Sequence, residues 1–187
     1  YSVTATDENG CEVSMSFEIT ESDAMEISGT TSDYVGYGVS CNGESDGAID
    51  VTVIGGTGIY TYAWSNGETT EDLGGLTAGF YSVTATDENG CEVSMSFEIT
   101  ESDAMEISGT TSDYVGYGVS CNGESDGAID VTVIGGTGIY TYAWSNGETT
   151  EDLGGLTAGF YSVTATDENG CEVSMSFEIT ESDAMEI

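Results

Sequence analysis

Hydrophobic and polar residues alternate over several short stretches of this chain. In an extended segment Ile49, Val51 and Val53 point to one side, and Asp50 and Thr52 point to the other. The other alternating stretches are residues 59–64, 81–87 and 91–100, with further strands expected near 25–31 and within 37–41 and 68–72. No stretch has a helical period, so the alternation predicts half-buried antiparallel strands.

Gly-Gly and Asn-Gly pairs separate these stretches at short intervals. They are Gly55-Gly56, Asn66-Gly67, Gly74-Gly75 and Asn89-Gly90. Asn-Gly between two alternating runs favours a tight hairpin with positive φ. Short strands with turns at this spacing predict an all-β unit, a sandwich of about seven antiparallel strands.

The sequence repeats without a single substitution. Residues 81–160 copy residues 1–80, and the copying continues to the end of the chain. A unit of this length can close around its own core. We therefore expect tandem β-sandwich domains at 28–107 and 108–187, arranged as beads on a string, with residues 1–27 forming the C-terminal strands of a preceding repeat.

The charge of the chain narrows its function. It has 35 acidic residues and no Lys, Arg or His, for a net charge of −35. Nucleic-acid binding needs cations against phosphate, and anionic membranes repel such a chain, so we expect neither nucleic-acid binding nor membrane insertion. General bases such as His and Lys are missing as well, so the chain is not expected to be an enzyme. Mutual repulsion keeps such chains soluble and apart.

The stretch "LTAGFYSVTA" at 76–85 resembles the tyrosine corner of immunoglobulin-like and fibronectin-like sandwiches. In that motif a Tyr at the start of a strand bonds its hydroxyl to the upstream backbone. The resemblance gives Tyr81 this role, and we expect Leu76 beside it and Trp64 as the central core aromatic. The corresponding residues of the second copy are Leu156, Tyr161 and Trp144.

Four motifs together resemble a known family. They are Cys-x-Gly-x-x-Asp-Gly at 41–47, Gly-Gly before Tyr-x-Tyr-x-Trp-Ser, Leu-x-x-Gly-x-Tyr at 76–81, and Asp-x-Asn-Gly-Cys at 87–91. Residues 39–93, 119–173 and 1–13 are similar to the SprB repeat of Bacteroidetes cell-surface proteins. One departure is Gly58-Ile59, where the family often has Pro before Tyr-x-Tyr.

This resemblance implies a function outside the cell. SprB-repeat proteins are giant secreted adhesins, attached to the outer membrane, exported by the type IX system and used in gliding motility. We expect this part to be a stalk that holds an adhesive tip away from the surface, each repeat adding ~35–45 Å. The alternative is a multivalent glycan- or surface-binding module acting by avidity through exposed aromatic residues. Expected partners are neighbouring repeats, lateral filaments or surface glycans.

The cell-surface location also implies disulfides. We expect one within each repeat, Cys41 with Cys91 and Cys121 with Cys171, and Cys11 bonded to a cysteine outside the chain. Closing a loop of about 50 residues would stabilise a repeat by roughly 3–4 kcal/mol. The rival pairing joins neighbouring units, Cys11 with Cys41 and Cys91 with Cys121.

Acidic loops raise the question of calcium. Ca²⁺ takes six to eight oxygen ligands from carboxylates and amides. The candidate ligands are Asp46, Asp50, Asp87, Asn89, Glu101 and Asp103. The same stretches, "ESDG" and "DENG", are also good turn sequences, and no EF-hand spacing is present. A specific ion site would be most useful at the junction between repeats, where it would offset repulsion.

Overall fold

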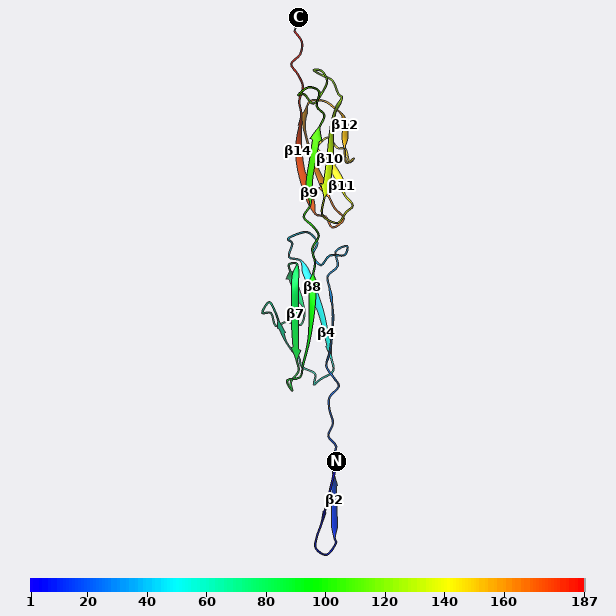
Figure 1. Ribbon diagram of the computed structural model, residues 1–187, viewed down its shortest axis with the longest axis vertical. Helices are drawn as coiled ribbons and strands as arrows, with labels where there is room; N and C mark the ends of the chain where they lie inside the picture. Colours follow the sequence, from blue (N-terminus) through cyan, green and yellow to red (C-terminus); the bar gives the residue numbers. More distant parts are fainter. Residues whose placement is uncertain (187) are drawn as a thin grey trace. The chain divides into compact units, whose positions relative to one another are not determined.

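The structure is a computed structural model that describes residues 1–186, and within this range it contains strands and no helix (Figure 1). Accordingly, no apolar helix long enough to cross a membrane occurs among these residues. The all-β class predicted from the alternation is confirmed.

Each repeat contributes six strands in the same order. In the first repeat they are β3 (Glu26–Thr31), β4 (Gly47–Ile54), β5 (Thr61–Trp64), β6 (Leu73–Leu76), β7 (Gly79–Thr86) and β8 (Glu92–Ile99). In the second they are β9 (Glu106–Thr111), β10 (Gly127–Ile134), β11 (Thr141–Trp144), β12 (Leu153–Leu156), β13 (Gly159–Thr166) and β14 (Glu172–Ile179). A hairpin of β1 (Ser2–Thr6) and β2 (Glu12–Ser16) precedes them.

The chain divides into two compact units. The first consists of residues 1–28, 51–71 and 82–95, and the second of residues 29–50, 72–81 and the chain from 96 onward. The first unit holds the β1–β2 hairpin and the pairing of β5 with β7. The second unit holds the whole second repeat together with the loop of the first repeat that carries Cys41.

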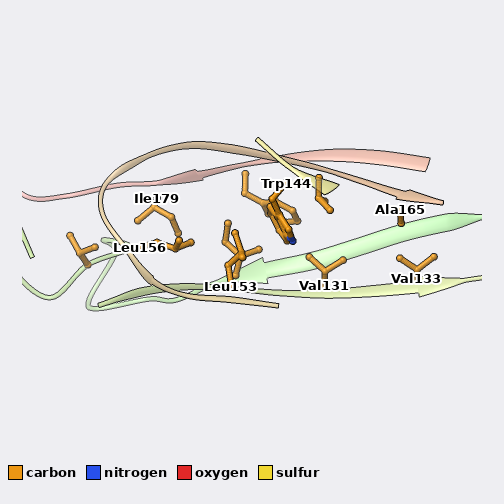
Figure 2. Close-up of a cluster of buried hydrophobic side chains, with 11 residues drawn as sticks. Val131, Val133, Trp144, Leu153, Leu156, Ala165 and Ile179 are labelled. Atoms are coloured by element: carbon orange, nitrogen blue, oxygen red, sulfur yellow. The ribbon is translucent and has the colours of Figure 1, made fainter. Parts of the chain in front are cut away.

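The second repeat shows how each copy builds its core. Its strands form two antiparallel three-stranded sheets, in the orders β12-β10-β9 and β11-β13-β14. Trp144 lies among the buried side chains between them (Figure 2). Its ring centroid is 6.1 Å from that of Phe177. The first repeat has sheets of the same order, β3-β4-β6 and β5-β7-β8, and the same buried residues. The chain is therefore a tandem array of immunoglobulin-like β-sandwiches.

The predicted faces agree with the burial of the strands. On β10, Ile129, Val131 and Val133 are buried, and Asp130 and Thr132 are exposed. Val131 and Val133 point into the core (Figure 2). A strand places alternate side chains on opposite faces, so the sequence pattern translates directly into inside and outside.

Two predicted strands are replaced by other structure. Residues 37–41 form a loop in which Val39 is fully buried and its N–H donates to the carbonyl of Thr100 (3.2 Å). The expected strand at 68–72 is displaced to β6, because Leu73 and Leu76 are the side chains there that reach the core, each 6% exposed. Each repeat thus has six strands rather than about seven.

The tyrosine hydroxyls make the bonds expected of a tyrosine corner. Tyr81 donates to the carbonyl of Thr77 and Tyr161 to that of Thr157, both at 3.0 Å. The Nε1 group of Trp64 donates to the carbonyl of Thr70 at 2.8 Å. Both Trp side chains are 5% exposed. The indole nitrogen therefore keeps a partner while the ring lies in the core.

The first strand of each repeat begins close to the expected domain limit. β3 begins at Glu26 and β9 at Glu106, so each repeat's first strand starts two residues before the limits of 28 and 108 drawn from the sequence. The limits themselves stay a prediction.

Replacing buried isoleucines should destabilise the sandwiches far more than replacing exposed ones on the same strands. Ile49 and Ile129 are 1% exposed, and Ile54 and Ile134 are 57% exposed. Ile49→Ala with Ile129→Ala should lower the free energy of unfolding by about 3 kcal/mol per repeat, through lost burial and a new cavity. The control pair Ile54→Ala with Ile134→Ala should change it by less than ~0.5 kcal/mol. Urea unfolding followed by Trp fluorescence measures both, and equal losses would contradict the assigned faces.

Candidate functional site

The two cysteines of a repeat lie at opposite ends of its last strand. Cys171 closes the β13–β14 turn, where its carbonyl accepts from the N–H of Asp167 (3.0 Å). Cys121 lies in a loop tied to the other end of β14, because the side chain of the next residue, Asn122, donates to the carbonyl of Ser182 (2.8 Å). The eight residues of β14 lie between the two ends, a length of ~26 Å.

This separation excludes the disulfide predicted within each repeat. Bonded cysteines need Cα atoms within about 7 Å of each other. The structure instead joins Cys41 to Cys171, with a Cα–Cα distance of 5.7 Å and a sequence separation of 130. The pairings Cys41–Cys91 and Cys121–Cys171 are therefore corrected, and neither pair of the rival scheme is formed. The remaining cysteines, Cys11, Cys91 and Cys121, are exposed and not in disulfides.

The segment between β8 and β9 is tied to both repeats by its backbone. On one side, the carbonyl of Thr100 accepts from the N–H of Gly38 at 2.8 Å. On the other, the carbonyl of Asp103 accepts from the N–H of Gly136, also at 2.8 Å. All of these residues belong to the second compact unit, as do Cys41 and Cys171. The six residues of this linker are thus held at both ends by hydrogen bonds.

The Gly135-Gly136 pair has a second role besides forming a turn. Gly135 has a φ of +79°, and a Cβ atom there would collide with the carbonyl of Ala104. The adjacent linker residue, Met105, packs against the core of the second repeat. Only a residue without a side chain allows the linker backbone to approach so closely.

Identical residues of the two copies differ in exposure where the repeats adjoin. Tyr34 and Tyr37 are half-buried, and their copies Tyr114 and Tyr117 are 40% and 44% exposed. The Nδ2 group of Asn169 donates to the carbonyl of Tyr34 at 3.1 Å. Since the two copies have the same sequence, the difference comes from the surroundings of each copy alone.

The candidate calcium ligands act as acceptors for nearby backbone groups. Asp46 accepts from the N–H of Ser40 (3.1 Å) and Glu101 from that of Gly43 (2.7 Å). Hydrogen bonds from the side chain and backbone of Ser40 hold the pKa of Asp46 below its ordinary value. Asp50 is exposed on β4, and the main chain of Asp103 makes the linker contact described above.

Asp87 and Asn89 share the β7–β8 turn. Oδ1 of Asp87 accepts from the N–H groups of Asn89 (2.9 Å) and Cys91 (2.8 Å), and Oδ2 accepts from that of Thr57 (3.1 Å). The bond from Cys91 is the main reason why the pKa of Asp87 is lowered. The carboxylate thus holds the turn together, which is the turn interpretation of "DENG".

A cavity of about 380 Å³ adjoins the Cys41–Cys171 disulfide and is lined also by Glu44, Asp103 and Glu172. Across residues 1–186, no group of three or more acidic, Cys or His side chains is placed to hold a metal ion. The structure therefore does not bring the candidate ligands together into a common site.

Parts of this chain are similar to a protein-family model. The model of the SprB repeat matches residues 39–69 and 119–149, equivalent segments of the two copies that make up about a third of the chain. The chain therefore matches the SprB-repeat model at two places. The match confirms the resemblance drawn from the sequence motifs, over the segments from the Cys41 and Cys121 loops through β5 and β11. SprB repeats indicate a cell-surface protein, and adhesin-repeat families are typically non-enzymatic. None of the curated proteins compared with the chain matches it.

Several solved structures are similar to this chain at low identity. A C-terminal 282-residue fragment of intimin, in complex with the intimin-binding domain of the translocated intimin receptor, is 16% identical over 87% of this chain, with a TM-score of 0.41. A tetra-tandem repeat from the extending region of a large adhesion protein is 21% identical over 96% of the chain (TM-score 0.26), and murine CEACAM1b is 11% identical over 74% (TM-score 0.30). The chain spans 64% of the intimin fragment, 55% of the adhesion fragment and 93% of CEACAM1b. Receptor binding is a property of intimin and is not assigned to this chain.

Acid should weaken the two repeats partly through Asp87 and Asp167. For Asp167, burial raises the pKa, but bonds from Cys171 and Thr137 outweigh it and the pKa is lowered. A lowered folded-state pKa stabilises the fold fully above the unfolded value of about 3.9 and ceases to do so as the pH falls through the folded value. Asp87→Asn with Asp167→Asn should therefore destabilise the chain at pH 6 and have a shrinking effect from about pH 4 downward. Asp50→Asn with Asp130→Asn, exposed positions that lose the same charge, is the control. A difference from this control that does not change with pH would contradict the assignment.

Counting free thiols should identify the disulfide of the present chain. Because the two repeats are identical, peptides around Cys91 and Cys171 cannot be told apart by mass, so variants are needed. The oxidised, denatured chain should show three free thiols. Cys171→Ser should raise the count to four, and the matched variant Cys91→Ser should lower it to two. Pairing within each repeat would give one free thiol in the parent chain and two in either variant.

Proposed function

We propose that this SprB-repeat chain is a spacer of a cell-surface adhesin, a stalk that holds an adhesive part away from the cell. The observation that carries the proposal is the linker at 100–105, which is hydrogen-bonded to both repeats and accompanied by a disulfide. A spacer transmits direction only if its joints resist bending. A linker with free backbone groups would not do so.

The linker is suited to this role because it is short and its backbone is hydrogen-bonded to both repeats. Six residues separate β8 from β9. The carbonyl of Thr100 accepts from Gly38 and Val39, and that of Asp103 accepts from Gly136. Asn42 donates to the carbonyl of Ser102 (2.8 Å). Ser102 is 3% exposed. Such groups have little freedom without breaking several bonds at once.

Charge and repetition support the same role. A net charge of −35 with no cationic side chain makes each stalk repel its neighbours, which keeps extended chains apart. Identical repeats allow length to change by whole units. Attachment to the outer membrane, export by the type IX system and a part in gliding motility remain expectations of the SprB family.

The alternative function, glycan or surface binding by avidity, has lost the support that rested on the two Trp residues. It depended on exposed Trp and Tyr side chains, and both Trp residues are 5% exposed, with Nε1 of Trp144 bonded to the carbonyl of Thr150. A buried indole has no free face on which a sugar ring can stack.

The spacer proposal predicts a narrow range of distances across the joint. Cys91 and Cys121 are exposed thiols that accept maleimide labels, in a Cys11→Ser background. With nitroxide spin labels, the distribution of distances between the two labels, measured by pulsed electron–electron double resonance, should be narrow. It should broaden when Cys41→Ser and Cys171→Ser remove the disulfide, and it should not change with EDTA. A broad distribution in the disulfide-bonded chain would overturn the spacer function, and broadening by EDTA alone would bring calcium into the joint.

A further inference from the structure

The single disulfide joins two different positions of the repeat. Cys41 is the copy of Cys121, and Cys171 is the copy of Cys91 and Cys11. The bond therefore connects the first cysteine of one repeat to the second cysteine of the following repeat, 130 residues further along. The three unpaired cysteines each lack a partner at this separation within residues 1–187.

We propose that the bond is a joint that recurs at every boundary of an array with this period, so that Cys121 is a docking point for a further copy of the repeat. By the same rule Cys91 would form a disulfide with the first cysteine of a preceding copy. The proposal rests on the spacer function and specifies how its joints are held. Its ligand is another SprB repeat, presented through the Asp-Glu-Asn-Gly-Cys turn.

The loop that carries Cys121 is already in the conformation that the bonded loop has. Asn42 donates to the carbonyl of Ser102 and Asn122 to that of Ser182, both at 2.8 Å. Gly43 and Gly123 donate to Glu101 and Glu181 at 2.7 and 2.8 Å. A partner would thus meet a preformed surface, which reduces the entropy lost on docking.

The turn that carries the second cysteine is preformed in the same way. The N–H of Cys171 donates to Asp167 at 2.9 Å, and those of Cys91 and Cys11 donate to Asp87 and Asp7 at 2.8 and 2.9 Å. The turn has one geometry whether or not its sulfur is bonded, so the bond does not create it.

Residues beside Cys121 are more exposed than their copies at the boundary between the two repeats. Met105 packs against the core of the second repeat, and its copy Met185 is 98% exposed. Ser102 is buried and its copy Ser182 only half-buried. Cys121 lies beside these residues, with Met185, on a cavity of about 360 Å³. The same residue types are covered at the boundary where a following repeat is present, so the occupant that fits is a following repeat.

Formation of the bond requires an oxidant. Two thiols lose two protons and two electrons to form one disulfide, and a small-molecule disulfide takes them up to become two thiols. Glutathione disulfide serves as that oxidant in the test.

The test compares the present chain with one lengthened by one identical 80-residue repeat, both refolded with glutathione disulfide. The added repeat brings two cysteines, and a recurring joint adds one disulfide, so both chains should have three free thiols. In the lengthened chain, Cys121→Ser should leave four free thiols and the matched variant Cys91→Ser two, because only the former removes a bonded cysteine.

Other counts would overturn the proposal. Five free thiols in the lengthened chain would mean that Cys121 does not bond, and one free thiol would mean pairing within repeats. The thiol count does not depend on the label distances that test the spacer function. Three free thiols with a broad distance distribution would therefore support the recurring joint and reject the spacer function. Five or one free thiols with a narrow distribution would reject the recurring joint and support the spacer function.

Discussion

The length of the last strand in each repeat governs how the repeats can be joined. β14 carries a turn with one cysteine at its start and a bonded loop with the other cysteine beyond its end. Eight extended residues place these ends ~26 Å apart, several times the span of a disulfide. Each repeat therefore has one cysteine at each end, and these two cysteines are too far apart to form a disulfide with each other. Bonding is then possible only between repeats, which is what the Cys41–Cys171 pair does.

The absence of cations has shaped the polar interactions as strongly as it has shaped the surface. A carboxylate in this chain has no Lys, Arg or His to pair with. Asp46, Asp87 and Glu101 accept backbone N–H groups instead, in the loops that hold the two cysteine positions. Hydrogen bonds to a charged acceptor are stronger than those between neutral groups. Acidic residues that look like metal ligands in the sequence thus serve as braces for turns.

Much of the fold could be predicted from the sequence, because it depends on local periodicity. Alternation placed Ile129 inside and Asp130 outside, and the Tyr81 hydroxyl bonds as a corner motif should. The disulfide could not be predicted by counting cysteines, since sequence separation does not say which end of a sandwich a loop reaches. The signal was nevertheless present, because the strand at 92–99 already separates Cys91 from the residues that hold Cys41. The close approach of the linker backbone to Gly135 could not be predicted, because a turn explains a Gly-Gly pair equally well.

Head-to-tail contact has a consequence that follows from symmetry alone. A contact that joins one surface to a different surface of the next copy leaves both surfaces available at the ends of any array. Such contacts do not close, so they set no limit on the number of repeats. In the proposed joint, Met185 and Cys121 belong to the exposed surface that would receive a further copy, and Met105 and Cys41 are the corresponding residues at the boundary within the chain. Because each joint uses a surface preformed within its own repeat, adding a copy requires no rearrangement of those before it. Sequence identity between copies then has a physical function, since every joint must accept the same two surfaces.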